Sequence, residues 1–146
     1  MTDSLHIDSG VIQLTVNDDP TRVVKFNPTD ILFIERFYQM QKDFMQKQKS
    51  FLERSKQLDE LNKELDESGN PVHAEESIQF LHEICAYMYE QIDKLFGEGT
   101  SQTVFQGMMS LDMIIQFFNS IIPFIEGART EMVEKYVQKE NTEIMK

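Results

Sequence analysis

A stretch of forty residues without glycine or proline constrains this chain more than any other feature. Between Pro28 and Gly69 neither residue type occurs, so a single helix can run through the whole stretch. Apolar side chains recur there every seven residues, which predicts one narrow seam packed against one partner helix. The seam consists of Phe37, Phe44, Phe51, Leu58 and Leu65. Lys47 and Arg54 interrupt the companion positions, so the pattern favours a hairpin or bundle helix over a free coiled coil.

The sequence also predicts where this long helix begins and ends. Asn27 is the expected N-cap, and Pro28 fits the first helical position because no backbone N–H is needed there. Gly69 is the expected left-handed cap beyond the helix, which we place over residues 28–67. Residues 46–70 carry mostly polar side chains around the thin seam, so we expect them to protrude from the core as an arm.

Part of the seam is a candidate contact between subunits. A protruding arm with a narrow apolar stripe must bury that stripe against another helix, either of this chain or of a second copy. A homo-oligomer is therefore one expectation. Its predicted seam residues are Phe44, Phe51, Leu58 and Leu65.

The whole sequence predicts a mostly α-helical fold. We expect a helical bundle with a long protruding helix or helical hairpin and a short N-terminal β-hairpin, forming one domain over residues 10–140. Its predicted elements are a β-hairpin at 10–26 and helices at 28–67, 73–96, 102–122 and 124–139. Pro123 is expected to kink or break the chain between the last two helices, since proline removes a backbone donor. Residues 1–9 and 141–146 are expected to be flexible ends.

The composition narrows the classes of partner. Lys and Arg number 14 against 25 Asp and Glu, which gives a formal net charge of -11. That charge opposes binding to nucleic acid and to anionic membranes, and it favours basic partners. Cys85 is the single cysteine, so a reducing compartment is the simpler expectation. Residues 104–125 approach the length of a membrane span, but polar side chains and Pro123 interrupt them, so no spanning helix is expected.

The helix predicted at 102–122 carries the candidate binding face. Its polar residues fall within one narrow arc, which is less than an ordinary surface helix presents to water. Either this helix is central in the core, or its apolar surface meets a client protein. Methionine and phenylalanine adapt well to irregular partner surfaces. The predicted anchors are Met108, Met109, Ile115, Phe118 and Ile122.

Three sequence features resemble sites of chemistry, and each has a simpler interpretation. His82 and Cys85 lie one helical turn apart, but the chain offers no further ligands at workable spacing for zinc. The glycine-rich run 97–101 lacks the lysine and the preceding strand of a phosphate loop. Asp112 interrupts an apolar helix and is the best candidate acid, although a solvated polar arc explains it as well. We therefore expect no enzyme activity, no metal and no cofactor.

Two stretches and their order resemble a known class of protein. FNPTDILF at residues 26–33 precedes a charged long helix, and IDKLFGEGTS at residues 92–101 precedes a helix rich in Phe and Ile. Over about residues 10–135 the chain resembles small acidic tail-module proteins of phages and prophages of Gram-positive bacteria, of the tail assembly chaperone type. The resemblance implies a non-enzymatic protein in the cytoplasm of the bacterial host. It also implies binding to the helical tape-measure protein, and sometimes to the tail-tube protein, before they polymerise.

Two other functions are compatible with the same sequence. A structural minor tail or baseplate subunit could use the β-hairpin to complete a neighbour's sheet. An acidic inhibitor could mimic DNA. Residues 28–70, however, interleave seven Lys or Arg with nine Asp or Glu, so they do not form a continuous negative array like that of the phosphates.

Overall fold

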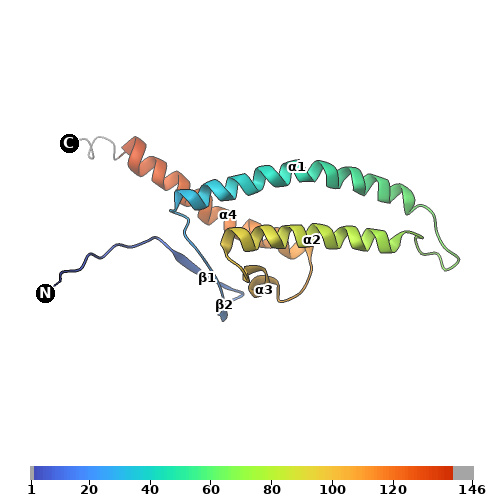
Figure 1. Cartoon of the computed structure of the whole chain (residues 1–146), viewed down its shortest axis with the longest axis horizontal. Helices are drawn as coiled ribbons and strands as arrows, with labels where there is room; N and C mark the ends of the chain where they lie inside the picture. Colours follow the sequence, from blue (N-terminus) through green and yellow to red (C-terminus); the bar gives the residue numbers. More distant parts are fainter. Residues whose placement is uncertain (1, 140–146) are drawn as a thin grey trace.

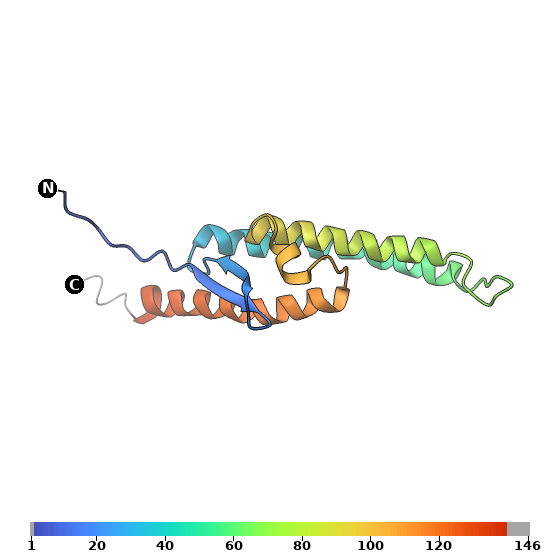
Figure 2. The ribbon, with the colours of Figure 1, turned by 90° about the horizontal axis from the view of Figure 1, so that it is seen from below.

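The computed structural model describes residues 2–139, and it confirms the mostly α-helical class with an N-terminal β-hairpin. Two long helices form an antiparallel hairpin, and a third long helix runs beside one half of it (Figures 1 and 2). The elements are β1 (Ile12–Val16), β2 (Asp19–Phe26), α1 (Ile31–Leu61), α2 (Ala74–Phe96), α3 (Thr100–Phe105), α4 (Leu111–Val133) and a π-helical turn (Glu134–Lys139).

The β-hairpin closes through a two-residue turn. Asn17 and Asp18 have φ values of 52° and 60°, the left-handed conformation that a tight hairpin turn requires and that Asn and Asp tolerate. β1 pairs with β2 in antiparallel register, with Leu14 opposite Val24. Because strand side chains alternate, Val24 and Phe26 reach the core while Lys25 between them faces outward. An isolated hairpin is marginal in water, so this packing onto the helices supplies its stability.

The core draws one fully buried side chain from each of the four α-helices. These residues are Phe37, Ile92, Phe105 and Ile125. Around them, phenylalanine rings connect the hairpin to the helices: Phe96 lies 5.4 Å from Phe26 and 5.4 Å from Phe117, measured between ring centroids. Edge-to-face rings at this distance add to the apolar burial. Since every α-helix contributes, none can be removed without opening the core.

The arm extends beyond the start of α4 and consists of the far halves of α1 and α2 (Figures 1 and 2). Phe51 of α1 lies 6.0 Å from the ring of Phe80 and 6.0 Å from the ring of Tyr87, both on α2. Arg54 lies 4.8 Å above the ring of Phe80 and forms an ion pair with Glu83. The arm is therefore an intrachain pair of helices, held by one aromatic cluster and a bridging arginine.

Both ends of the first long helix differ from the sequence prediction. Asp30 is the N-cap and accepts a hydrogen bond from the backbone N–H of Leu32, while Asn27 is engaged in the preceding turn. The helix ends at Leu61 rather than at residue 67. Gly69 has a φ of 84° but lies in the following loop, so it does not cap the helix.

The helices predicted at 102–122 and 124–139 are also divided differently. The break falls at residues 106–110, where Gln106 and Gly107 adopt φ values of 52° and 82°. Ser110 then caps α4 by accepting the N–H of Met113, and α4 continues through Pro123 without a break. Pro123 and the preceding turn at Asn119 are exposed, so water can satisfy the carbonyl that proline leaves without a donor.

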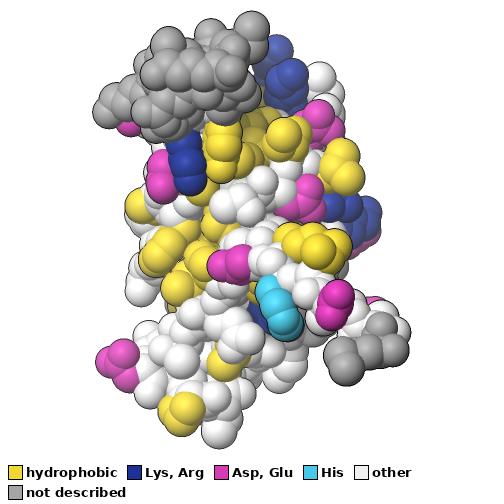
Figure 3. Space-filling model, turned by 90° about the vertical axis from the view of Figure 1, so that its left-hand side faces the viewer, with side chains coloured by type: hydrophobic (Ala, Val, Ile, Leu, Met, Phe, Trp, Pro, Cys, Tyr) yellow, Lys and Arg dark blue, Asp and Glu magenta, His cyan; other side chains and the backbone are white. Residues whose placement is uncertain are grey.

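The sequence predicts flexible segments at both chain ends, residues 1–9 and 141–146. Residues 2–11 contain no helix, strand, turn or bend. The expected tail at 141–146 lies outside the described residues. Figure 3 views the end of the molecule from which residues 2–8 extend, where apolar side chains lie among charged ones at the surface.

Candidate partner-binding surfaces

Two hollows lie on opposite sides of α4. The helix buries Ile114, Phe117, Ile121 and Ile125. One flank faces the β-hairpin and borders the first hollow, which we call the hairpin hollow. The start of the helix meets α2 at the second hollow, which we call the arm hollow. Each hollow leaves apolar surface open, so each is a candidate for binding a partner.

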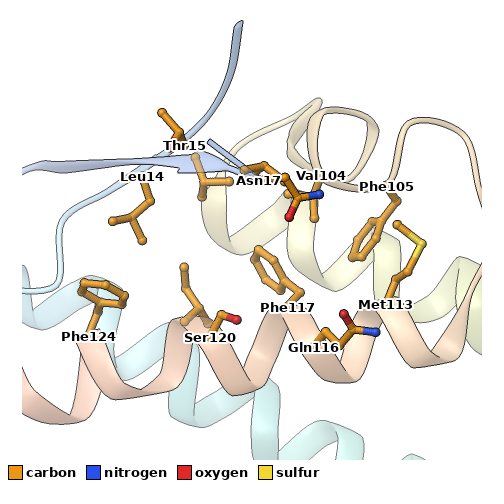
Figure 4. A pocket seen from close by; sticks show the side chains of 13 residues that line it. Leu14, Thr15, Asn17, Val104, Phe105, Met113, Gln116, Phe117, Ser120 and Phe124 are labelled. Carbon is orange, nitrogen blue, oxygen red and sulfur yellow. The ribbon is translucent and has the colours of Figure 1, made fainter. Parts of the chain in front are cut away.

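The hairpin hollow has a volume of about 340 Å³ and a mainly apolar lining. Figure 4 shows Leu14 of β1 pointing toward α4, with Ser120 and Phe124 on the helix below it. Phe124 is 44% exposed despite its size. Further lining side chains are Val16, Val24, Val104, Phe105, Met113 and Phe117. The sequence analysis did not identify this hollow, because it forms between elements that are about a hundred residues apart in the chain.

The arm hollow has a volume of about 480 Å³ and lies where α2 leaves the body. Its lining residues are Ile78, Leu81, His82, Cys85, Met109, Leu111 and Asp112. Ile78 and Leu81 are 66% and 49% exposed, although both are large aliphatic side chains. Their spacing of three residues on α2 is the sequence signal for a shared face.

A tyrosine positions the loop that forms one wall of the arm hollow. Tyr89 stacks on Phe105 with ring centroids 4.6 Å apart, and its hydroxyl donates to the Met108 carbonyl at 2.5 Å. The backbone N–H of Ser110 donates back to the same hydroxyl at 3.3 Å. Burial raises the pKa of Tyr89, so it stays protonated and able to donate at neutral pH. The exposed Met108 and Met109 are thus carried on an anchored loop.

The five predicted anchors do not form one face. Met108, Met109 and Ile115 are exposed, and Met109 lines the arm hollow. Phe118 and Ile122 are only partly exposed and pack against the core, with Phe118 edge-on to Phe117. The predicted surface is therefore split into an open part near the arm hollow and a largely covered part.

The predicted oligomer seam is used within the chain. Phe51 is buried against α2, and Phe44 stacks with Tyr87 at 6.4 Å. Leu58 is half-buried, while Leu65 lies beyond the end of α1 and is 58% exposed. The heptad correctly indicated a helix partner, and α2 of the same chain covers Phe44 and Phe51 of that seam.

The residues that the sequence analysis considered for metal binding, acid catalysis or phosphate binding have simple structural roles. Cys85 is buried as a free thiol, and burial raises its pKa, which keeps it unreactive. His82 and Asp112 line the same hollow, yet among residues 2–139 no three His, Cys, Asp or Glu side chains are placed to hold one metal ion. In the glycine-rich run, the Asp93 carboxylate accepts both the N–H and the hydroxyl of Ser101. That contact occupies donors which a phosphate would require.

One helical stretch is long and apolar enough to cross a membrane by length and composition alone. It spans Leu111–Val137, and 22% of its most apolar window is buried in the protein. Core helices of soluble proteins share this length and composition. Here the stretch contributes Ile114, Ile121 and Ile125 to the core.

Comparison with other proteins gives one family and no characterised relative. No curated protein and no solved structure matches the chain. A family model described as a family of unknown function, DUF6673, matches residues 21–144, from the second strand into the C-terminal tail. The match covers most of the chain, so the protein belongs to this family of unknown function.

Proposed function

We propose that the protein is a non-enzymatic binding protein whose arm hollow covers the apolar stripe of a helical partner. The observation that carries this proposal is the group of exposed aliphatic and methionine side chains around the arm hollow. Ile78 and Leu81 of α2 and Met109 of the loop before α4 line the hollow. Met108 on the same loop and Ile115 on α4 are also exposed. A groove between two helices fits an amphipathic helix, which inserts side chains spaced by three and four residues.

The charges around the arm hollow indicate which helices fit. Glu75 lies one helical turn before Ile78 on α2, and Asp112 stands on the opposite wall in the first turn of α4. Over residues 71–100 six acids face one base, a net of -5. The occupant we propose is therefore an amphipathic helix whose apolar stripe is flanked by Lys or Arg.

A tape-measure protein is the client that we propose, as the resemblance to tail assembly chaperones implies. Such a chain consists of long amphipathic helices whose apolar stripes stay uncovered until a tube encloses them. Covering those stripes with a soluble, strongly acidic protein keeps the complex in solution. The host cytoplasm is the corresponding location, and neither a cofactor nor a metal is part of this proposal.

Co-purification tests the proposal directly. Tagged protein is co-expressed with a tape-measure protein from a phage or prophage of a Gram-positive bacterium, and the captured client is quantified. Ile78→Asp should reduce capture at least about tenfold, because a buried carboxylate replaces an apolar contact. The matched control is Gln79→Asp, which adds the same charge at the neighbouring exposed position. Helical content should stay unchanged in both variants, because both side chains are exposed. Equal capture by Ile78→Asp and wild type would reject the arm hollow as the client site.

A structural tail subunit is the second candidate, and the unpaired outer edge of β1 favours it. In the described part of the chain the sheet has two strands, so this edge has backbone groups free for a neighbour. Purified virions distinguish the two functions. A chaperone should be absent from them, and a structural subunit should be present in fixed proportion to the tube protein.

A further inference from the structure

Residues 2–8 leave the body of the protein with two large apolar side chains uncovered. Leu5 is 87% exposed and Ile7 is 85% exposed, the highest values among the exposed large hydrophobic residues. Their spacing of two places both side chains on one side of an extended chain. Figures 1 and 2 both show this segment running away from the β-hairpin. An extended segment with one apolar side has the pattern of a β-strand without a sheet.

A polar latch fixes the direction in which this segment leaves. Asn27 Nδ2 donates to the Ser9 carbonyl at 2.6 Å, and the Asn27 side chain is itself held by the Thr29 hydroxyl. Gly10 has a φ of +83°, and a Cβ built there would lie 2.4 Å from Thr29 Oγ1. Residues 2–11 contain neither turn nor bend. The latch therefore directs the segment away from β1 of its own chain.

The outer edge of β1 can accept such a segment, because it is an unpaired strand edge beside an apolar hollow. Among residues 2–139 its only strand partner is β2, and no other backbone hydrogen bond reaches it. The same strand borders the hairpin hollow, whose floor includes Phe117, Ile121 and Phe124. An unpaired edge above an apolar hollow is suited to an added strand, because backbone pairing and side-chain burial occur together.

We propose that residues 3–8 of a second copy add to the outer edge of β1 and place Leu5 and Ile7 in the hairpin hollow. Six extended residues span about 20 Å, which matches the roughly 17 Å of the five residues of β1. Each copy has one donor segment and one acceptor edge, so in a closed homo-oligomer every edge can be paired with a segment. Reciprocal exchange between two copies would close the assembly as a symmetric dimer. The proposal does not depend on the arm hollow or on its client.

Light scattering coupled to gel filtration measures the association. Wild type should show a mass above that of the 17.1 kDa chain, rising toward twice that value with concentration. The double variant Leu5→Asp with Ile7→Asp should remain monomeric, since two carboxylates cannot enter the hollow. The control Ser4→Asp with His6→Asp adds the same two carboxylates on the opposite side of the segment and should still associate. A monomeric wild type, or equal behaviour of the two double variants, would overturn the proposal.

Cross-linking tests whether the N-terminal segment of one copy lies beside β1 of another. In a Cys85→Ser background, one tagged chain carries His6→Cys, and an untagged chain carries Thr15→Cys or Gln13→Cys to sample two registers. These positions face outward from the extended sheet, where neighbours on adjacent strands have Cβ atoms about 4.5–5.5 Å apart. A disulfide between tagged and untagged chains supports exchange. The absence of a link at both positions would exclude it. A link formed only inside a chain that carries both cysteines would show that the segment folds back on its own β1.

Discussion

A single tyrosine joins the first and last long helices of the protein. Tyr38 of α1 donates its hydroxyl hydrogen to a carboxylate oxygen of Glu126 on α4, across 88 residues of sequence. Arg129 donates to the other carboxylate oxygen at 2.7 Å. The hydrogen bond from Tyr38, followed by that from Arg129, lowers the pKa of Glu126. Burial, followed by the hydrogen bond to Glu126, raises the pKa of Tyr38.

This contact predicts a loss of stability in acid. The folded-state pKa of Glu126 lies below the ordinary 4.5, so its contribution is complete above that value. The contribution disappears as the pH falls through the lowered folded pKa. Glu126→Gln should therefore show a shallower acid decline in the free energy of unfolding than wild type. The difference should stay below about 1 kcal/mol, because the Glu126 side chain is 39% exposed.

Urea unfolding at a series of pH values measures this difference. Glu131→Gln, an exposed acid one and a half turns further along the same helix, is the control and should follow the wild-type curve. Parallel acid declines for Glu126→Gln and wild type would show that the contact contributes nothing measurable.

At the scale of elements, the arm is packed separately from the rest of the protein. Phe51 and Phe80 are buried, but they do not belong to the main cluster of buried residues. Most neighbouring side chains along the arm are polar and exposed. A region with few buried apolar contacts opens at a lower free energy than the core does. We therefore expect the arm to separate locally while the body of the protein stays folded.

Phe51→Ala tests this independence. Removing a buried ring that contacts both Phe80 and Tyr87 should cost about 3–5 kcal/mol. The cost should appear as faster amide hydrogen exchange in residues 45–61 and 74–84, with slow exchange retained around Ile92 and Ile125. Leu52→Ala, at a neighbouring position that is 56% exposed, should change little. Uniform acceleration across all helices would mean that the arm and the body unfold as one unit.

Periodicity predicted the elements well and their boundaries poorly. The helix expected at 73–96 and the hairpin expected at 10–26 occur almost as predicted, because apolar spacing and local turn residues together define them. Asn27 was the wrong N-cap because its side chain is used by Ser9 and Thr29, a contact that no local pattern reveals. Pro123 does not end its helix because it lies on the solvent side, and the sequence does not specify which side faces water.

The candidate binding surface was predicted only in part, because spacing along one helix does not show which of its residues other helices cover. Spacing identified an apolar helix, and three of its five proposed anchors are exposed. It could not show that Phe118 and Ile122 pack on the core, since that depends on where the other helices lie. The hollows form between distant segments, so only the folded chain reveals them.

At the scale of the whole molecule, the net charge of -11 acts on association rates. If the client helix carries flanking Lys or Arg, attraction over about 10 Å at 0.1 M salt should speed encounter. Raising the salt concentration should lower the association rate constant several-fold and leave the dissociation rate constant nearly unchanged. Binding to surface-immobilised client measures both rate constants, and stopped-flow mixing measures the association rate constant in solution. A salt-independent association rate would show that the acidic surface does not steer the client.

The sharing of the core among all four α-helices also determines when the protein can fold during its synthesis. Ile125 belongs to α4, which leaves the ribosome after the other three α-helices of residues 2–139, and it packs in the same core as Phe37. Until α4 has emerged, the nascent chain has both strands and the helices α1, α2 and α3 available, but Phe96 lacks its contact with Phe117 and the core stays partly open. A ribosome stalled so that the chain up to residue 110 has left the exit tunnel, while α4 is still inside it, should therefore display an exposed, aggregation-prone intermediate. Emergence of α4 should then complete folding in one cooperative step.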